Sequence, residues 1–153
     1  MSYSIIHLLY GKVNYTDMRI MGIDYGDRRI GIAVSDPLGI TAQGVKTVQN
    51  KGFKKIKIEL LELLSQYSPE KIVLGLPKNM DGTLGFRADE TYKFADFLKT
   101  LTDKEIIFWD ERLTTVSASL ILNETNTRGR DRKKVIDTVS ACIILENYMQ
   151  SIK

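Results

Sequence analysis

The stretch from Arg19 to Ser35, RIMGIDYGDRRIGIAVS, holds two apolar runs with a short polar turn between them. The first run ends at Tyr25 and the second begins at Arg29, and Gly26 provides a residue suited to a tight turn. Two strand-like runs this close together predict a β-hairpin. The folded part of the chain is therefore expected to begin with antiparallel strands, with Asp24 near the end of the first.

The residues after the hairpin first continue the sheet and then change to a helical pattern. Residues 40–48 predict a third strand, which is entered through the turn-forming residues 36–39. Apolar side chains then recur at helical spacing as far as Ser68-Pro69, where a helix is expected to end. These side chains are Ile56, Leu60, Leu63, Leu64 and Tyr67.

The second half of the chain alternates strands with helices. KIVLGLP, residues 71–77, is short and continuously apolar, which is typical of a buried parallel strand, and EIIFWDE, residues 105–111, predicts the fifth strand. One helix is indicated between these strands and two more after them. The first is marked by Phe94, Phe97, Leu98 and Leu101, and the others are expected from about Val116 to Asn123, capped by Thr114 or Thr115, and from about Lys133 to Gln150.

This order predicts an α/β domain with a five-stranded mixed sheet, in which a three-stranded antiparallel meander precedes two parallel strands and helices cover both faces. A single domain is expected over residues 18–153, because a chain of 153 residues suits one core. Residues 1–17 are expected to precede the domain as an extension, either a genuine segment or the result of an upstream start codon.

The composition restricts the chemistry that this chain can perform. With one cysteine and one histidine, His7, it cannot build a Cys/His zinc site and has almost no base for a Ser-His-Asp or Cys-His system. One cysteine also excludes an internal disulfide framework, and no apolar run is long enough to span a membrane. We therefore expect a cytoplasmic protein without a membrane partner, in which carboxylates, lysines and hydroxyls carry any catalysis.

Acidic residues near two strand ends are candidates for that role. Asp24 shares strand parity with Ile20 and Gly22, and an acid on an apolar strand is costly to bury unless it is paired or binds a metal. The alternative for Asp24 is a turn aspartate bonded to local amides. In the fifth strand, Asp110 and Glu111 point to opposite sides, so alternation alone does not choose between them.

A third candidate acid, Asp137, lies near the start of the last predicted helix. At about 100° per residue, Ala141, Ile144 and Tyr148 fall within about 40° of Asp137, which therefore heads an apolar stripe. The alternative is a surface pair with Lys133, one turn earlier, which would contribute only a few tenths of a kcal/mol.

Carboxylates without histidine suit hard cations such as Mg²⁺ or Mn²⁺. Two such ions about 4 Å apart can activate a water and stabilise the leaving oxygen in phosphodiester cleavage. The net charge of +3, and the five bases against one acid in residues 128–134, favour a polyanionic partner. Nucleic acid is therefore the expected substrate. A looser basic group follows the third strand and consists of Lys51, Lys54, Lys55 and Lys57.

Four motifs, GIDYGDRRIGIAVSD, IVLGLPKNMDGT, WDERLTT and KKVIDTVSACIILENY, resemble the YqgF/RuvX family, a relative of the resolvase RuvC with an RNase H-like fold. The resemblance covers the chain from Met18 to its end and implies a nuclease that uses Mg²⁺ or Mn²⁺, with two ions. Carried over motif by motif, the catalytic and metal-binding acids are Asp24, Glu111 and Asp137. Asp110 is then an outer ligand or the partner of Arg112.

The resemblance leaves three functions open. The leading one is an endonuclease that processes the 5′ end of the 16S rRNA precursor. The alternatives are a Holliday junction resolvase, acting on four-way DNA junctions, and a non-catalytic RNA- or ribosome-binding factor. The protein is expected to be a monomer or a homodimer. The residues expected to contact phosphates are Arg28, Arg29, Arg112, Arg128, Arg130, Arg132, Lys133 and Lys134.

Overall fold

The structure is a computed structural model that describes residues 19–113 and 130–153, with side-chain surroundings described for residues 19–112 and 138–153. The helix predicted from about Val116 to Asn123, its caps Thr114 and Thr115, and residues 1–17 lie outside the described residues. Among the helices that are described, none is long and apolar enough to cross a bilayer.

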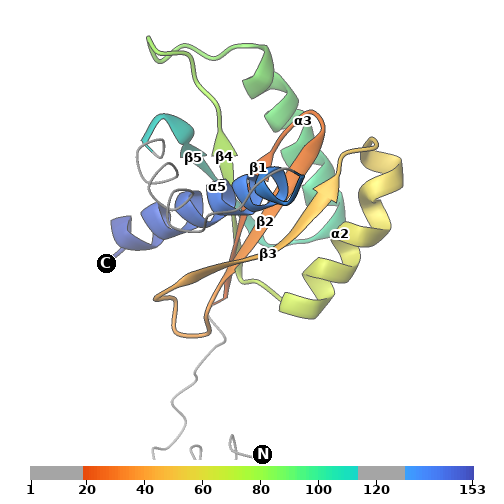
Figure 1. The fold of residues 1–153 in the computed structure, drawn as a ribbon, viewed down its shortest axis with the longest axis vertical. Coiled ribbons are helices and arrows are strands. Elements are labelled where there is room, and N and C mark those ends of the chain that lie inside the picture. The colour runs from red at the N-terminus through yellow and green to blue at the C-terminus, as the bar shows by residue number, and fades with distance from the viewer. Residues whose placement is uncertain (1–18, 114–129) are drawn as a thin grey trace, which may run out of the picture.

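Five strands form one mixed sheet in the order β3-β2-β1-β4-β5 (Figure 1). The first three make an antiparallel meander, and β4 and β5 add to β1 in parallel, which confirms the predicted sheet. The bounds are β1 (Ile20–Tyr25), β2 (Arg29–Ser35), β3 (Ala42–Gln49), β4 (Lys71–Leu76) and β5 (Glu105–Asp110).

Helices cover both faces of the sheet, as predicted (Figure 1). The three described α-helices each begin earlier than the apolar pattern indicated. The helix before β5 starts at Phe86, because its first turn is largely exposed and carries little of the apolar stripe. The bounds are α2 (Phe53–Tyr67), α3 (Phe86–Leu101), the short 3₁₀ helix η1 (Glu111–Leu113) and α5 (Arg130–Ser151).

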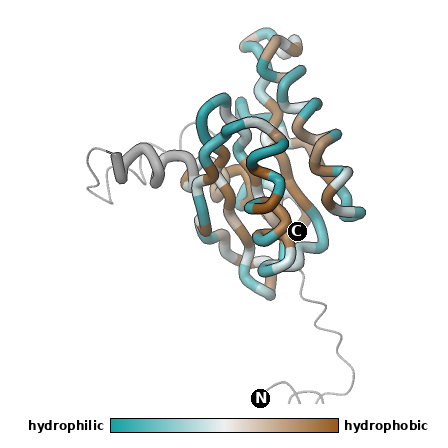
Figure 2. Tube along the Cα trace, turned by 90° about the vertical axis from the view of Figure 1, so that its right-hand side faces the viewer, coloured by the Kyte–Doolittle hydropathy of each residue, from teal (hydrophilic) through white to brown (hydrophobic). Residues whose placement is uncertain are grey.

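Strand alternation sends one set of side chains toward α2 and α3. From β1 these are Met21 and Ile23, which belong to the same buried cluster as Ile56 and Leu60 of α2 and Phe94 of α3. Burial of apolar surface on both sides of the strands is the main stabilising contribution of such a core. Figure 2 shows hydrophobic segments gathered in the middle of the molecule and hydrophilic ones at its outer turns.

The opposite face of the sheet packs against α5 alone among the described helices. A side chain on Gly22 of β1 would place its Cβ 2.8 Å from the backbone oxygen of Ala141 and 2.8 Å from Cβ of Leu145. Gly22 therefore allows the helix to lie close against the central strand. Farther along α5, Tyr148 meets Trp109 of β5 edge to face, with ring centroids 6.1 Å apart. The helix thus crosses the sheet toward the β5 edge.

Candidate active site

Asp24 lies one residue before the end of β1, at the carboxyl ends of the parallel strands β1 and β4. Its parity partners are Ile20, which is buried in the cluster under α5, and Gly22, which contacts α5. Asp24 therefore faces the side of the sheet that α5 covers, where it is half-buried. Asp24 lies on the same side of β1 as Ile20 and Gly22, as the sequence predicted, and the structure shows that this side faces α5.

Glu111 begins η1, directly after the last residue of β5. In β5, Ile107 and Trp109 pack in the cluster under α5, and Glu111 continues on their side. Burial, the nearby charge of Asp24 and a hydrogen bond with the Asp24 carboxylate raise the pKa of Glu111 to about 8. In the metal-free protein at neutral pH, Glu111 therefore keeps a proton that it shares with Asp24.

Gly75 of β4 makes room for this pair, and the sequence had not singled it out. Gly75 is paired in register with Trp109, the residue two before Glu111. A Cβ atom at this position would lie 2.5 Å from Oε1 of Glu111 and 2.6 Å from Cδ1 of Ile144. The signal in the sequence was a glycine inside an otherwise apolar strand, which often marks a close approach.

Asp110, the neighbouring acid, is engaged elsewhere. Its carboxylate accepts hydrogen bonds from the Arg112 side chain, with Nη2 to Oδ2 at 2.7 Å and Nε to Oδ1 at 3.1 Å, and from the Arg112 backbone amide at 3.0 Å. The Nζ of Lys78 lies 3.8 Å from Oδ2. Hydrogen bonds from Arg112 hold the pKa of Asp110 below its ordinary value. Asp110 therefore stays ionised and closes the turn that positions Glu111.

Asp137 lies in α5 by its backbone, and its side chain lies outside the described surroundings, as do those of Arg130, Arg132, Lys133 and Lys134. Arg128 lies outside the described residues altogether. The next residue, Thr138, shows where this part of α5 lies. A Cβ on Gly44 of β3 would lie 2.7 Å from the Thr138 Cβ, so α5 passes over β3 at this point.

Three arginines lie on elements that adjoin the strand of Asp24 or act on Glu111. Arg28 is exposed in the β1–β2 turn, and Arg29 is half-buried at the start of β2, where its carbonyl accepts the Gly26 amide at 3.0 Å. Arg87, in the first turn of α3, had not been predicted to contribute, yet its positive charge acts to lower the pKa of Glu111. No motif marks Arg87, because only the packing of α3 brings it toward the site.

The donor set fits a hard divalent cation. Among the described residues no group of three or more histidines, cysteines or acids comes together as a set of metal ligands. Asp24 and Glu111 supply carboxylate oxygens, which Mg²⁺ prefers, and this ion commonly keeps several waters. Without a metal ion, Asp24 and Glu111 share a proton. A bound cation can replace that proton and neutralise the charge of both carboxylates.

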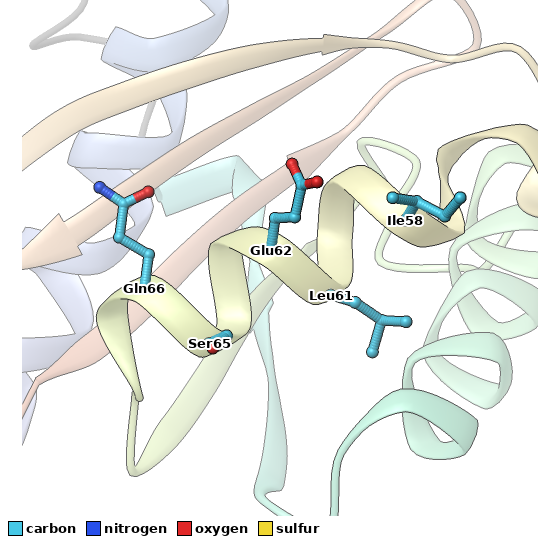
Figure 3. Close-up of a pocket in the computed structure, with 5 residues that line it drawn as sticks. All are labelled: Ile58, Leu61, Glu62, Ser65 and Gln66. Atoms are coloured by element: carbon cyan, nitrogen blue, oxygen red, sulfur yellow. The ribbon is translucent and has the colours of Figure 1, made fainter.

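An open groove elsewhere on the surface is a poor candidate for catalysis. It runs along α2, which covers the sheet face opposite Asp24 and Glu111, and it contains one carboxylate and no second acid (Figure 3). The lining residues are Ile58, Leu61, Glu62, Ser65 and Gln66. The carboxylate pair, and not this groove, is therefore the candidate active site.

The fold and the carboxylate geometry can now be set beside known proteins. A family model described as "RuvX: Holliday junction resolvase" matches residues 18–151. The chain belongs to the RuvX family. The match covers β1, which carries Asp24, and extends through Asp137 to the end of α5.

Relatives of this RuvX family member agree with that assignment. A Clostridium tetani protein whose name proposes a pre-16S rRNA nuclease is 49% identical over 135 residues, covering 88% of this chain and 98% of the relative. A Clostridioides difficile protein with the same name is 50% identical over 133 residues, covering 87% and 94%. Both carry the name of a nuclease, so the predicted resemblance is confirmed.

Solved structures agree at the level of the fold. The yeast mitochondrial Holliday junction resolvase Ydc2 aligns with a TM-score of 0.54 at 10% identity, covering 98% of this chain and 85% of that one. At this identity the likeness concerns the fold alone. The RuvX family member therefore has the RNase H-like, resolvase-type fold that the sequence predicted.

Proposed function

We propose that this protein is a metal-dependent endonuclease that acts in the cytoplasm and processes the 5′ end of the 16S rRNA precursor. The observation that carries the proposal is the hydrogen-bonded pair of Asp24 and Glu111, brought together from β1 and from the turn after β5. Membership of the RuvX family and the nuclease names of its relatives support the same reaction class.

In this proposal Asp24, Glu111 and Asp137 hold Mg²⁺ or Mn²⁺, with two ions in the complete site. When bound, the ions supply charge neutralisation at the scissile phosphate and an activated water for its hydrolysis. Glu111 gives up its proton as the cation binds, because a raised pKa reflects the cost of a second negative charge beside Asp24. The carboxylate pair is therefore held in place before the metal arrives.

Basic residues on several elements are proposed to hold the phosphates. Arg87 acts on Glu111 from α3, Arg28 and Arg29 lie in and directly after the β1–β2 turn, and residues 128–134 add the most basic segment of the sequence. Arg112 takes another role in this arrangement, because its guanidinium is committed to Asp110 at 2.7 Å. It positions the turn that carries Glu111 and contacts phosphate only if Asp110 releases it.

The direct test uses a precursor 16S rRNA fragment with its 5′ leader, incubated with Mg²⁺, Mn²⁺ or EDTA. We expect cleavage with either ion, none with EDTA, and none with Asp24→Asn, which retains the fold and the binding of RNA. Full activity of Asp24→Asn would contradict the proposal. If the wild-type protein binds the RNA but does not cleave it with either metal ion, the result would instead support a non-catalytic RNA- or ribosome-binding factor.

Resolution of four-way DNA junctions is the second candidate, favoured by the resolvase-type fold and by the description of the family. Junction resolution requires two symmetric cuts and therefore a symmetric dimer. A synthetic four-way junction under the same metal conditions, together with the molecular mass in solution, separates the two functions. A monomer that cleaves precursor RNA and leaves the junction intact supports RNA processing.

A further inference from the structure

A cationic surface lies at the start of α2, outside the candidate active site. Residues 50–58 hold four lysines and no acid, and Arg28 lies nearby with one acid, Asp27, in its turn. All five basic side chains are exposed, and no ion pair is found for them among the described residues. We call these residues the α2 cationic surface: Arg28, Lys51, Lys54, Lys55 and Lys57.

Helix stability does not account for these lysines. The N-terminal end of a helix carries partial positive charge, so acids stabilise it and lysines do not. The first turn of α2 contains no acid, and the residue before it, Gly52, offers no capping side chain. By contrast, Lys93 and Lys99 of α3 each lie beside an acid of their own helix, at 3.1 Å and 3.7 Å. The charge pattern at the start of α2 therefore suits an external anion better than it suits the fold.

Hydrogen bonds join this surface to the strand that carries Asp24. The Asn50 backbone amide donates to the Arg28 carbonyl at 2.8 Å, and the Asn50 side chain donates to the Gly26 carbonyl at 2.8 Å. Lys51 follows directly in the chain, so it lies beside Arg28. In Figure 1 the β1–β2 turn and the start of α2 lie together on the same side of the molecule.

An aromatic cluster adds a second connection. Tyr25, the residue after Asp24, stacks on Phe94 of α3 with ring centroids 4.3 Å apart. Phe94 in turn meets Phe53, the first residue of α2, at 6.1 Å. Because Lys54 follows Phe53, the packed rings hold the lysines at a set position relative to the catalytic strand. The surface is therefore a fixed neighbour of the site and separate from it.

We propose that the α2 cationic surface binds the phosphate backbone of the nucleic-acid substrate beside the cleavage site. This inference rests on the proposed nuclease function and extends its substrate contacts from Arg28, which the sequence already indicated, to the four lysines at the start of α2. The surface adjoins the turn that follows the strand of Asp24, through the hydrogen bonds of Asn50, so it binds phosphates that flank the scissile one. It therefore contributes to affinity and to the salt dependence of binding, and leaves the chemical step unchanged.

The test is the variant Lys54→Glu/Lys55→Glu, with Lys93→Glu/Lys99→Glu as the control of equal charge change. Binding of the precursor 16S rRNA leader fragment is measured by fluorescence anisotropy in EDTA at several salt concentrations. At 0.1 M salt we expect the first variant to lose about tenfold or more in affinity, and its salt slope to fall by about 2. The control is expected to change neither.

The melting temperature gives a readout that a structural role would not share. Acids in the first turn of α2 favour the helix dipole, so the first variant is expected to melt at the same temperature as the wild type or higher, while it binds RNA more weakly. Its KM should rise with kcat unchanged.

Two outcomes would overturn the inference: wild-type RNA affinity and salt slope in the Lys54→Glu/Lys55→Glu variant, or equal losses in the control variant. If the wild type binds RNA through these lysines and cleaves nothing, the proposed nuclease function fails and the binding surface stands.

Discussion

The carboxylates of Asp24 and Glu111 are joined by a hydrogen bond in the space that Gly75 leaves on the strand between them. The two acids lie 87 positions apart in the chain, and β4 separates the strands that carry them. A glycine on the middle strand is what lets the longer Glu111 side chain reach Asp24. The pair thus depends on three strands at once, and each can be tested.

Removing either acid of the pair should abolish cleavage, whereas removing Asp110 should not. Mutation of a residue that only supports a metal ligand typically lowers activity by roughly 10–100-fold. We expect Asp24→Asn and Glu111→Gln each to lower kcat by more than this. Asp110→Asn, which loosens the turn through Arg112, should stay within that range. The measurement is single-turnover cleavage of the precursor RNA at saturating Mg²⁺. If only the Asp110 change stops cleavage, the assignment of Glu111 is wrong.

Adding one methyl group at Gly75 should disturb both the fold and the site. Its Cβ would lie 2.5 Å from Oε1 of Glu111 and 2.6 Å from Cδ1 of Ile144, so Gly75→Ala should cost about 1–3 kcal/mol of unfolding free energy. Urea denaturation measures this loss. Gly22→Ala is the matched control, because its Cβ meets Ala141 and Leu145 of α5 and no carboxylate. Both variants should lose stability, and only Gly75→Ala should lose cleavage per folded molecule.

The raised pKa of Glu111 predicts a particular dependence on pH. The folded protein keeps the proton up to about pH 8, whereas the unfolded chain releases it near the ordinary value of 4.5. Without metal, stability should therefore fall as pH rises between these values, by at most about 1.4 kcal/mol per pH unit from this group. Glu111→Gln removes the titration and should flatten the curve.

Urea unfolding of both proteins at several pH values in EDTA compares the two slopes. Mg²⁺ competes with the same proton, so its affinity should increase across the same interval in the wild type. Parallel curves for the wild type and Glu111→Gln would show that Glu111 does not hold the proton.

The ion pair between Asp110 and Arg112 should order the loop between β4 and α3. The Nη1 atom of Arg112 would lie 3.3 Å from a Cβ on Gly82, and Lys78 from the same loop reaches Asp110 at 3.8 Å. Arg112→Gln should therefore speed amide exchange in the loop, above all at two amides. The Asn79 amide donates to the Thr83 carbonyl at 2.9 Å, and the Thr83 amide donates to Oδ1 of Asp81 at 2.9 Å. Exchange in α2 provides the internal control, and unchanged loop exchange would mean that the loop orders itself.

Much of the fold could be read from local patterns. The hairpin of β1 and β2, the apolar run of β4 and the helical spacing of α2 all depend on residues close together in the chain, and these elements form where they were expected. The start of α3 was missed because its first turn is exposed, so burial left no periodic trace there. Arg87 was missed for the same reason, since its role depends on where that turn packs.

The sequence by itself determined the order of the described strands and helices from their local patterns, and the parity of Asp24, because side chains alternate along a strand whatever surrounds it. Strand alternation did not choose between Asp110 and Glu111, which it sends to opposite faces, and the choice of Glu111 came from the family resemblance. Only the tertiary structure shows that Glu111 meets Asp24, because both lie on the face of the sheet that α5 covers. Asp110 lies on the other side, where it pairs with Arg112. Gly75 has no side chain, and this leaves the space that the Glu111 side chain occupies.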